Sequence, residues 1–386
     1  MGGMEVFSTL LILLMFLSIA FGYQTGQVVL PPFWRPMSAF ILVAVIGIVL
    51  GSSSFANKFY DVGRMRFFLI YFSLFYYLAY FETSSRWQNV LFWTALIVGC
   101  YGVVQHFIPI DLVRATKITQ YNSVFEGRTI TRVFGTFNHP LTFSSVYLFY
   151  ACLFVGLGLS NIPGRWWWFL NGCLAYLVVL WTESRVAWFA IPVTWLVLGF
   201  SKGKRKMLYS LLLGIAVFVS IFALDPSLRS RWKEVSSDVN RSRLWATNWE
   251  MFKANPWVGI GFNNNERRCR DYIEQIYPGI PEKRCGHAHS NVLQILSSMG
   301  ILGTMAFVWL WGEIFAALFT LLSRYPKEQT EYWLALGLFA GFVGFQIQGL
   351  TQWNFGDAEV LHNVVFFWAV LASLLHKSSE CAPRSI

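Results

Sequence analysis

Eleven apolar segments, most of them close to 20 residues long, constrain the fold of this chain more than any other feature. About 20 consecutive apolar residues are enough for one helix to cross the hydrocarbon core of a bilayer. The runs are continuous rather than alternating, which favours helices over a β-barrel. We therefore expect an all-α polytopic membrane protein with about 11 transmembrane helices, within a range of 10–12. The segments are Glu5–Tyr23, Trp34–Ser53, Arg66–Phe81, Val90–Ile108, Pro140–Leu159, Trp166–Trp181, Val186–Ser201, Met207–Leu224, Ile301–Ser323, Tyr332–Leu350 and Val360–His376.

The composition agrees with a membrane protein, so membrane lipids are expected among its partners. Charged residues make up 13% of the chain, whereas soluble proteins carry about 25%. The 18 Trp and 16 Tyr residues suit anchors at membrane interfaces. The net charge of +10 is attributed to loops beside lipid head groups, and no nucleic-acid-binding motif occurs, so no nucleic acid is expected as a partner. The run Phe7–Tyr23 lacks a basic start and a cleavage site, which indicates a retained helix.

The charged loops predict which face each segment occupies. The turn Ser201–Lys206 is cationic without an acid, so the positive-inside rule places it in the cytoplasm. One helix later, the hydrophilic stretch Asp225–Ser290 then lies outside, with eleven Lys or Arg against eight Asp or Glu. The same count puts three further polar segments outside: Asp111–His139, Thr182–Arg185 and Thr351–Glu359. The polar clusters thus converge on one face. The side of the membrane on which the N-terminus lies stays open. Eight helices before the large loop would put it outside, whereas nine would put it inside.

This topology predicts three parts of the chain. Residues 1–224 form N-terminal transmembrane helices, residues 225–290 form a large extracytoplasmic loop with part of the active site, and residues 291–386 form C-terminal transmembrane helices.

The run from His287 to Ser290, followed after nine residues by Gly300-Ile301-Leu302-Gly303, is the first candidate for chemistry. Histidine exchanges a proton near neutral pH, so His289 or His287 is a candidate general base on a hydroxyl. Ser290 and Asn291 offer polar partners. A histidine that only caps an interfacial helix is the plainer alternative. A zinc site with a loop cysteine is a third, although the spacing matches no standard zinc pattern.

Two of the loop cysteines leave a question open. Cys269 and Cys285 could form a disulfide if the loop faces an oxidising compartment, but sequence distance does not fix geometry. Cys100, Cys152 and Cys173 lie in apolar runs and are expected to be buried.

Several arginines stand at the predicted outer face. Arginine binds phosphate in a bidentate manner and keeps its charge at low dielectric. Arg185, Arg241, Arg243 and Arg132 are therefore candidates for diphosphate binding. The alternative for an arginine at a helix end is an extended side chain that reaches lipid head groups.

The remaining polar motifs argue mostly against cofactors. No Asp-x-Asp and no phosphate-binding Gly-rich loop occur, which disfavours a metal-bridged sugar nucleotide and ATP-driven work. Asp357 and Glu359 could hold a cation, but pairing with the arginines is simpler. We expect no metal and no cofactor. The run Asn255–Phe262 is predicted to be a structural turn with glycine-permitted geometry.

Together these motifs make the chain resemble the O-antigen ligase and polymerase superfamily of bacterial polysaccharide assembly. The resemblance covers most of the chain after about Tyr101. The ligase branch has a histidine before Asn, Ser or Gln, then nine residues and Gly-x-x-Gly, as at His289 and Gly300–Gly303. It also has an arginine with leucine four residues later, where Arg185 fits and Phe189 departs. The matching segments are Gly135–Pro140, Ser184–Trp188, Arg243–Trp245, Asn255–Gly261 and His287–Asn291.

The resemblance implies a multi-pass enzyme of the bacterial inner membrane with its active site on the periplasmic face. It would transfer a polysaccharide from undecaprenyl diphosphate to a sugar of the lipid A–core, with inversion and without a metal. His289 would be the general base, and Arg185, Arg243, Arg241 and Arg132 would neutralise the diphosphate. His287, Ser290, Asn291, Asp357 and Glu359 would support the site. A repeat-unit polymerase, a protein O-oligosaccharyltransferase and, from another class, a lipid or glycan transporter remain alternatives. The oligomeric state stays open.

Overall fold

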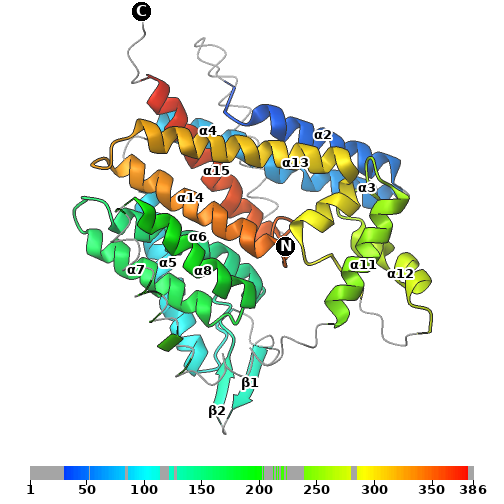
Figure 1. The fold of residues 1–386 in the computed structure, drawn as a ribbon, viewed down its shortest axis with the longest axis horizontal. Coiled ribbons are helices and arrows are strands. Elements are labelled where there is room, and N and C mark those ends of the chain that lie inside the picture. Colours follow the sequence, from blue (N-terminus) through cyan, green and yellow to red (C-terminus); the bar gives the residue numbers. More distant parts are fainter. Residues whose placement is uncertain are drawn as a thin grey trace, which may run out of the picture. The chain divides into compact units, whose positions relative to one another are not determined.

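The computed structural model describes residues 30–51, 53–82, 86–113, 121–125, 128–201, 239–279 and 285–380, with a few single positions between 203 and 223. Almost all of its regular structure is helical (Figure 1). One short antiparallel hairpin, β1 (Asn122–Phe125) and β2 (Arg128–Thr131), lies in a segment expected to be a loop. The described chain packs as two compact units, each assembled from separate stretches of sequence.

Unit 1 comprises Met1–Ser84, Val239–Leu321 and Phe355–Ile386. Helix α4 packs against α15. Phe355 lies in an aromatic core of this unit, where its ring centroid is 5.8 Å from that of Phe40 in α2 and 5.1 Å from that of Phe307 in α13. The helices of this unit are α2 (Trp34–Leu50), α3 (Phe55–Arg64), α4 (Arg66–Tyr76) with the π-helical turn η1 (Tyr77–Phe81), α11 (Val239–Ala254), α12 (Asn265–Ile276), α13 (Asn291–Arg324, whose last turn belongs to unit 2) and α15 (Ala358–Glu380).

Unit 2 comprises Ser85–Asp238 and Leu322–Asn354. Its centre is α6, which packs against α7 and α14. In the most apolar stretch of α6, 94% of the residues are buried. A side chain at Gly156 would meet the Trp333 carbonyl at 2.7 Å, so glycine permits the close approach of α6 and α14. The helices of this unit are α5 (Arg86–Phe107), α6 (Pro140–Gly158), α7 (Arg165–Leu180), α8 (Arg185–Phe200) and α14 (Thr330–Gly349).

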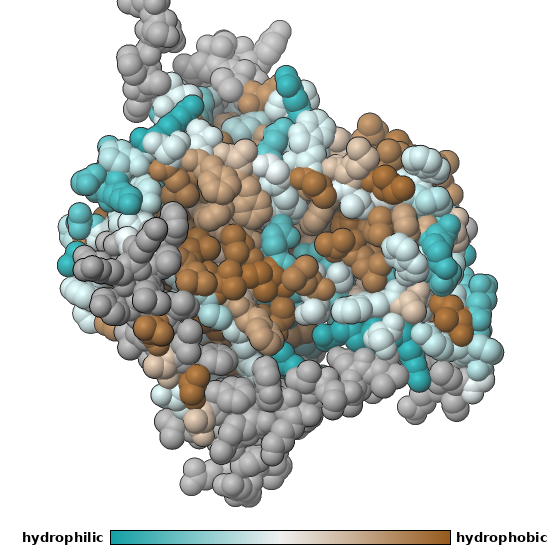
Figure 2. Space-filling view, viewed as in Figure 1, coloured by the Kyte–Doolittle hydropathy of each residue, from teal (hydrophilic) through white to brown (hydrophobic). Residues whose placement is uncertain are grey.

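Four described helices are long and apolar enough to cross a membrane, namely α5, α6, α13 and α15. Figure 2 shows extensive apolar areas on the face in view, as expected for a surface that meets lipid. The predicted helical, membrane-protein character is thereby confirmed, whereas the count of 11 spans stays a prediction. Glu5–Tyr23 and nearly all of Met207–Leu224 lie outside the described residues. The three-part division at 224 and 290 follows membrane topology rather than packing and also stays a prediction.

The prediction of burial was confirmed for Cys152 and was wrong for Cys100 and Cys173. Cys100 is exposed and Cys173 is half-buried, because an apolar membrane helix can present an outward face. The predicted segment Ile301–Ser323 matches the part of α13 that follows the kink at Gly300. The stretch from Asn291 to the kink is also helical, and its polar side chains such as Gln294 and Ser297 interrupt the apolar pattern.

Candidate functional site

The predicted histidines lie in the short segment that leads into α13. Ser290 begins the helix, because its Oγ accepts the Leu293 N–H at 3.4 Å. Gln294 reaches back from the first turn, and its Oε1 accepts the Ala288 N–H at 2.7 Å. Between these two bonds His289 adopts φ 47°, a left-handed backbone that non-glycine residues rarely occupy. The helix start therefore fixes the position of His289.

His287 and His289 lie beside each other and beside an acid of α12. Their ring centroids are 4.2 Å apart. His287 Nδ1 lies 3.1 Å from Glu266 Oε1, with 34% of the His287 side chain exposed. The hydrogen bond with His287 is the main cause that lowers the pKa of Glu266. Sequence reasoning missed Glu266, because nothing in a linear pattern relates it to a histidine 21 positions away.

A buried polar triad fixes the helices around this segment. The Asn265 amide donates to Asn248 Oδ1 and to Ser297 Oγ, each at 2.7 Å. Ser297 Oγ in turn donates to Asn248 Oδ1 at 2.9 Å. All three side chains are fully buried, and they come from α12, α11 and α13. Buried hydrogen bonds of this kind favour a single arrangement of their helices.

A second anchor holds α12 from the side of α3. The Arg267 guanidinium donates to both Asp61 oxygens, at 2.6 and 3.2 Å, and Asp61 is 1% exposed. The Asn263 amide donates to the same carboxylate at 2.8 Å. This pairing raises the pKa of Arg267 and keeps its neighbour Glu266 on the side of His287. No motif in the sequence predicted this ion pair.

Glycines lock the turn before α12 against α13. The Ile260 and Gly261 N–H groups donate to the Ser297 and Ser298 carbonyls at 3.1 and 3.0 Å. A Cβ at Gly300, where α13 kinks with φ 65°, would lie 2.4 Å from the Trp257 backbone. The interpretation of Asn255–Phe262 as a structural turn is therefore confirmed.

Two predicted diphosphate ligands lie near the start of α11: Arg241 in its first turn, which carries no acidic residue, and Arg243 in its second. Both side chains are half-buried, and the Arg243 guanidinium carbon lies 5.7 Å from the centre of the Tyr277 ring. Helix N-termini attract anions, so two guanidinium groups there make a strongly cationic position.

Two of the predicted supporting residues, Asn291 and Asp357, accept backbone hydrogen bonds near the starts of helices. Asn291 Oδ1 accepts the Phe355 N–H at 3.2 Å, which ties the start of α13 to the segment before α15. Asp357 Oδ1 accepts the Glu359 N–H at 3.0 Å and thereby begins α15. Among the described residues, no group of three or more His, Cys, Asp or Glu side chains is placed to hold a metal ion.

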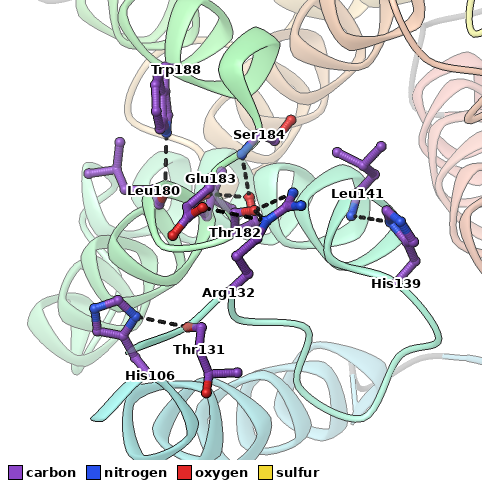
Figure 3. Close-up of polar contacts among 11 residues, drawn as sticks. His106, Thr131, Arg132, His139, Leu141, Leu180, Thr182, Glu183, Ser184 and Trp188 are labelled. Carbon is purple, nitrogen blue, oxygen red and sulfur yellow. Dashed lines mark hydrogen bonds and ion pairs between the residues drawn. The ribbon is translucent and has the colours of Figure 1, made fainter. Parts of the chain in front are cut away.

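The other two predicted arginines belong to unit 2. Figure 3 shows Arg132 beside the turn at Thr182 and Glu183, where its Nε and one terminal nitrogen donate to the Thr182 carbonyl at 3.1 and 3.0 Å. Its Nε lies 3.7 Å from Glu183 Oε2, and Glu183 is 4% exposed. Arg185 opens α8 and is half-buried. Arg132 is thus strongly engaged by the fold.

The same turn is tied into unit 2 by further bonds. Gln352 of the segment after α14 donates to Ser184 Oγ at 2.9 Å, and the Val133 N–H donates to the Trp181 carbonyl at 2.9 Å. His139, at the end of the Gly135–Pro140 motif, accepts the Leu141 N–H at 3.0 Å and caps α6 (Figure 3). This motif accordingly starts a helix.

The structure therefore gathers His287, His289, Ser290 and Asn291 in unit 1 and places Arg241 and Arg243 on α11 of the same unit. Arg132 and Arg185 stand in unit 2. The roles assigned to these residues stay predictions.

Comparisons with known proteins support this resemblance. A model described as O-antigen ligase matches residues 170–308, which include Arg185, Arg243 and His289. A curated O-antigen ligase of Salmonella typhimurium is 24% identical over 381 residues, covering 93% of this chain and 88% of that protein. The resemblance to the O-antigen ligase family that the motifs predicted is therefore confirmed, with residues 170–308 as the part that matches the family model.

Proposed function

We propose that this protein is an O-antigen ligase of the bacterial inner membrane. It moves a polysaccharide from undecaprenyl diphosphate to a sugar hydroxyl of the lipid A–core, on the periplasmic face. The family match supports a glycosyl-transfer enzyme. The observation that carries the proposal is the His287–His289 pair beside Glu266, half-exposed at the start of α13 and inside the matched region.

In the proposed reaction His289 takes the proton from the acceptor hydroxyl as its oxygen attacks the anomeric carbon. The bond from that carbon to the diphosphate oxygen breaks, and the diphosphate leaves with the electron pair on its carrier lipid. Direct displacement inverts the anomeric centre. Glu266 and His287 act as positioning residues, because a carboxylate on His287 holds the ring that packs against His289.

Arginine is the proposed source of charge for the leaving group. Arg241 and Arg243 are favoured by their place in the first two turns of α11, where no acid stands in the first turn. Arg185 is favoured by its place at the start of α8, which also lies in the matched region. Arg132 has fewer donors to offer, since Thr182 takes two of its nitrogens. Such charge stabilisation is worth about 2.7–4 kcal/mol per contact.

The test is transfer by the purified full-length protein reconstituted with undecaprenyl-diphosphate glycan and rough lipopolysaccharide. We expect glycan on the lipid A–core, transfer that persists in EDTA, and loss of transfer in His289→Ala. Glycan that instead lengthens on its own carrier would replace the ligase with the polymerase. Loss of transfer in EDTA would overturn the metal-independent reaction.

A further inference from the structure

Two cysteines of unit 1 face each other across the contact between α12 and the histidine segment. Cys269 lies on α12 and is fully buried, whereas Cys285 is exposed two residues before His287. Both are reduced thiols in the structure. The Cys269 sulfur hydrogen-bonds with the Cys285 side chain and with the Gly286 backbone N–H.

An independent contact sets the same register. Glu266, one helical turn before Cys269, bonds to His287, two residues after Cys285. Residues three apart on a helix share a face, and residues two apart in an extended segment do too. The segment therefore runs along one face of α12, so that 266 meets 287 and 269 meets 285. This register brings the Cys285 side chain to the Cys269 thiol, and a disulfide forms only where two cysteine side chains meet in this way.

We propose that Cys269 and Cys285 form a disulfide in an oxidising compartment, and that this bond holds the His287–Ser290 segment against α12. The positioning role rests on the proposed function, whereas the bond itself does not. Apolar packing alone accounts for the burial of Cys269, which lies with Leu244, Met251 and Ile260. Apolar packing does not explain why a second cysteine, Cys285, lies beside the Cys269 thiol.

The oxidant is the disulfide of a thiol-oxidising protein. The exposed Cys285 thiolate attacks that disulfide, which forms a mixed disulfide and releases one thiolate of the oxidant. Cys269 then loses its proton and attacks the Cys285 sulfur, which releases the second thiolate. The two cysteines lose two electrons and two protons in total, and the oxidant becomes a dithiol. Burial raises the pKa of Cys269 to about 12, so Cys285 is the entry point and Cys269 completes the exchange.

The first experiment detects the bond. Full-length protein is expressed in cells with an oxidising extracytoplasmic face, its thiols are blocked with N-ethylmaleimide under denaturing conditions at lysis, and its peptides are mapped without reductant. We expect the Cys269 and Cys285 peptides to be linked, and the link to vanish with dithiothreitol. In Cys285→Ser, Cys269 should be recovered as a blocked thiol. Recovery of both cysteines as blocked thiols in the wild-type protein would overturn the proposal.

The second experiment tests positioning by local hydrogen exchange. Reduction, or Cys285→Ser, should raise amide exchange of residues 286–290 by about tenfold, because local opening of the segment becomes easier. Exchange within α6 should not change. Cys100→Ser is the matched control, since Cys100 is also exposed but lies on α5 of unit 2. A linked peptide with unchanged exchange at 286–290 would overturn the positioning role and leave the ligase proposal untouched.

Discussion

The turn before α8 and the turn before α13 use the same backbone device for different ends. In each, a non-glycine residue takes a left-handed conformation two positions before the helix starts. Glu183 has φ 55° ahead of Arg185, and His289 has φ 47° ahead of Asn291. Such a conformation costs about 1–2 kcal/mol for a residue with a side chain, so the surrounding structure must impose it.

The two turns differ in where they send the side chain. Glu183 points into unit 2, where Arg132 pairs with it and Thr182 and Ser184 are buried beside it. His289 stays half-exposed, and the bonds that fix its backbone come from Gln294 and Ser290. A strained residue that is fully enclosed serves the fold, whereas one that is fixed but reachable can meet a substrate. This contrast favours chemistry at His289 over chemistry at Glu183.

The largest expected effect would come from His289→Ala. Loss of a general base lowers the rate of transfer by about 10²–10⁴-fold. The His289 side chain is half-exposed, so the unfolding midpoint in detergent should stay close to that of the wild type. The measurement is initial transfer rate together with thermal unfolding. An equal loss of activity in Glu183→Ala without unfolding would break the contrast between the two turns.

Gly300→Ala tests whether the packing of α13 fixes the histidine turn. Its Cβ would meet the Trp257 backbone at 2.4 Å, and its φ of 65° disfavours a side chain. Because backbone cannot yield as a flexible side chain can, we expect a loss of about 3 kcal/mol in unfolding free energy. Gly312→Ala is the matched control, since it lies on the same helix with nothing within 4 Å of an added Cβ. The measurement is denaturant unfolding of both variants. Equal unfolding midpoints would contradict the inference that the packing of α13 fixes the histidine turn.

Glu183→Gln tests the enclosed turn. It removes the carboxylate that faces Arg132 and leaves a mostly buried guanidinium without that charged partner. Breaking a buried pair costs about 3–5 kcal/mol, and the 3.7 Å separation reduces the expected loss to about 2 kcal/mol. The unfolding midpoint should fall, while the transfer rate at permissive temperature stays within a few-fold. A stable variant with greatly reduced transfer would move Glu183 into the reaction.

The sequence predicted the helices of unit 2 well, because their apolar runs match spans such as α6 and α14 within two residues at each end. It predicted the histidine segment and the structural turn at Asn255–Phe262, because local motifs encode both. It could not predict Glu266, Asp61 or the triad at Asn248. Those contacts join residues tens to hundreds of positions apart, and only the packing of α3, α11, α12 and α13 brings them together.

Substitution by glycine measures the strain that the two turns share. Glycine adopts φ near 50° freely but also loses more entropy on folding, so the net gain over alanine is about 1 kcal/mol. We therefore expect His289→Gly to unfold at higher denaturant than His289→Ala, and Glu183→Gly at higher denaturant than Glu183→Ala. Similar increments at both sites would confirm a common backbone device. No increment at His289 would show that its left-handed conformation is not imposed.

The smallest effect on stability should come from Glu266→Gln, and its pH dependence distinguishes positioning from stability. Glu266 is 67% exposed, so solvent screening limits its pairing with His287 to less than about 1 kcal/mol of stability. Its pKa is lowered in the folded state, so this contribution is present above the ordinary carboxyl pKa of about 4.3 and is lost as pH falls through the lowered value. The stability difference between wild type and variant should therefore be fully present above about pH 5 and decline as the pH falls through the lowered pKa. Transfer should drop by about tenfold, equivalent to about 1.4 kcal/mol of lost orientation, with a shifted pH profile. A variant that loses stability but keeps the wild-type pH profile of transfer would make Glu266 a structural partner, as Glu183 is in the other turn.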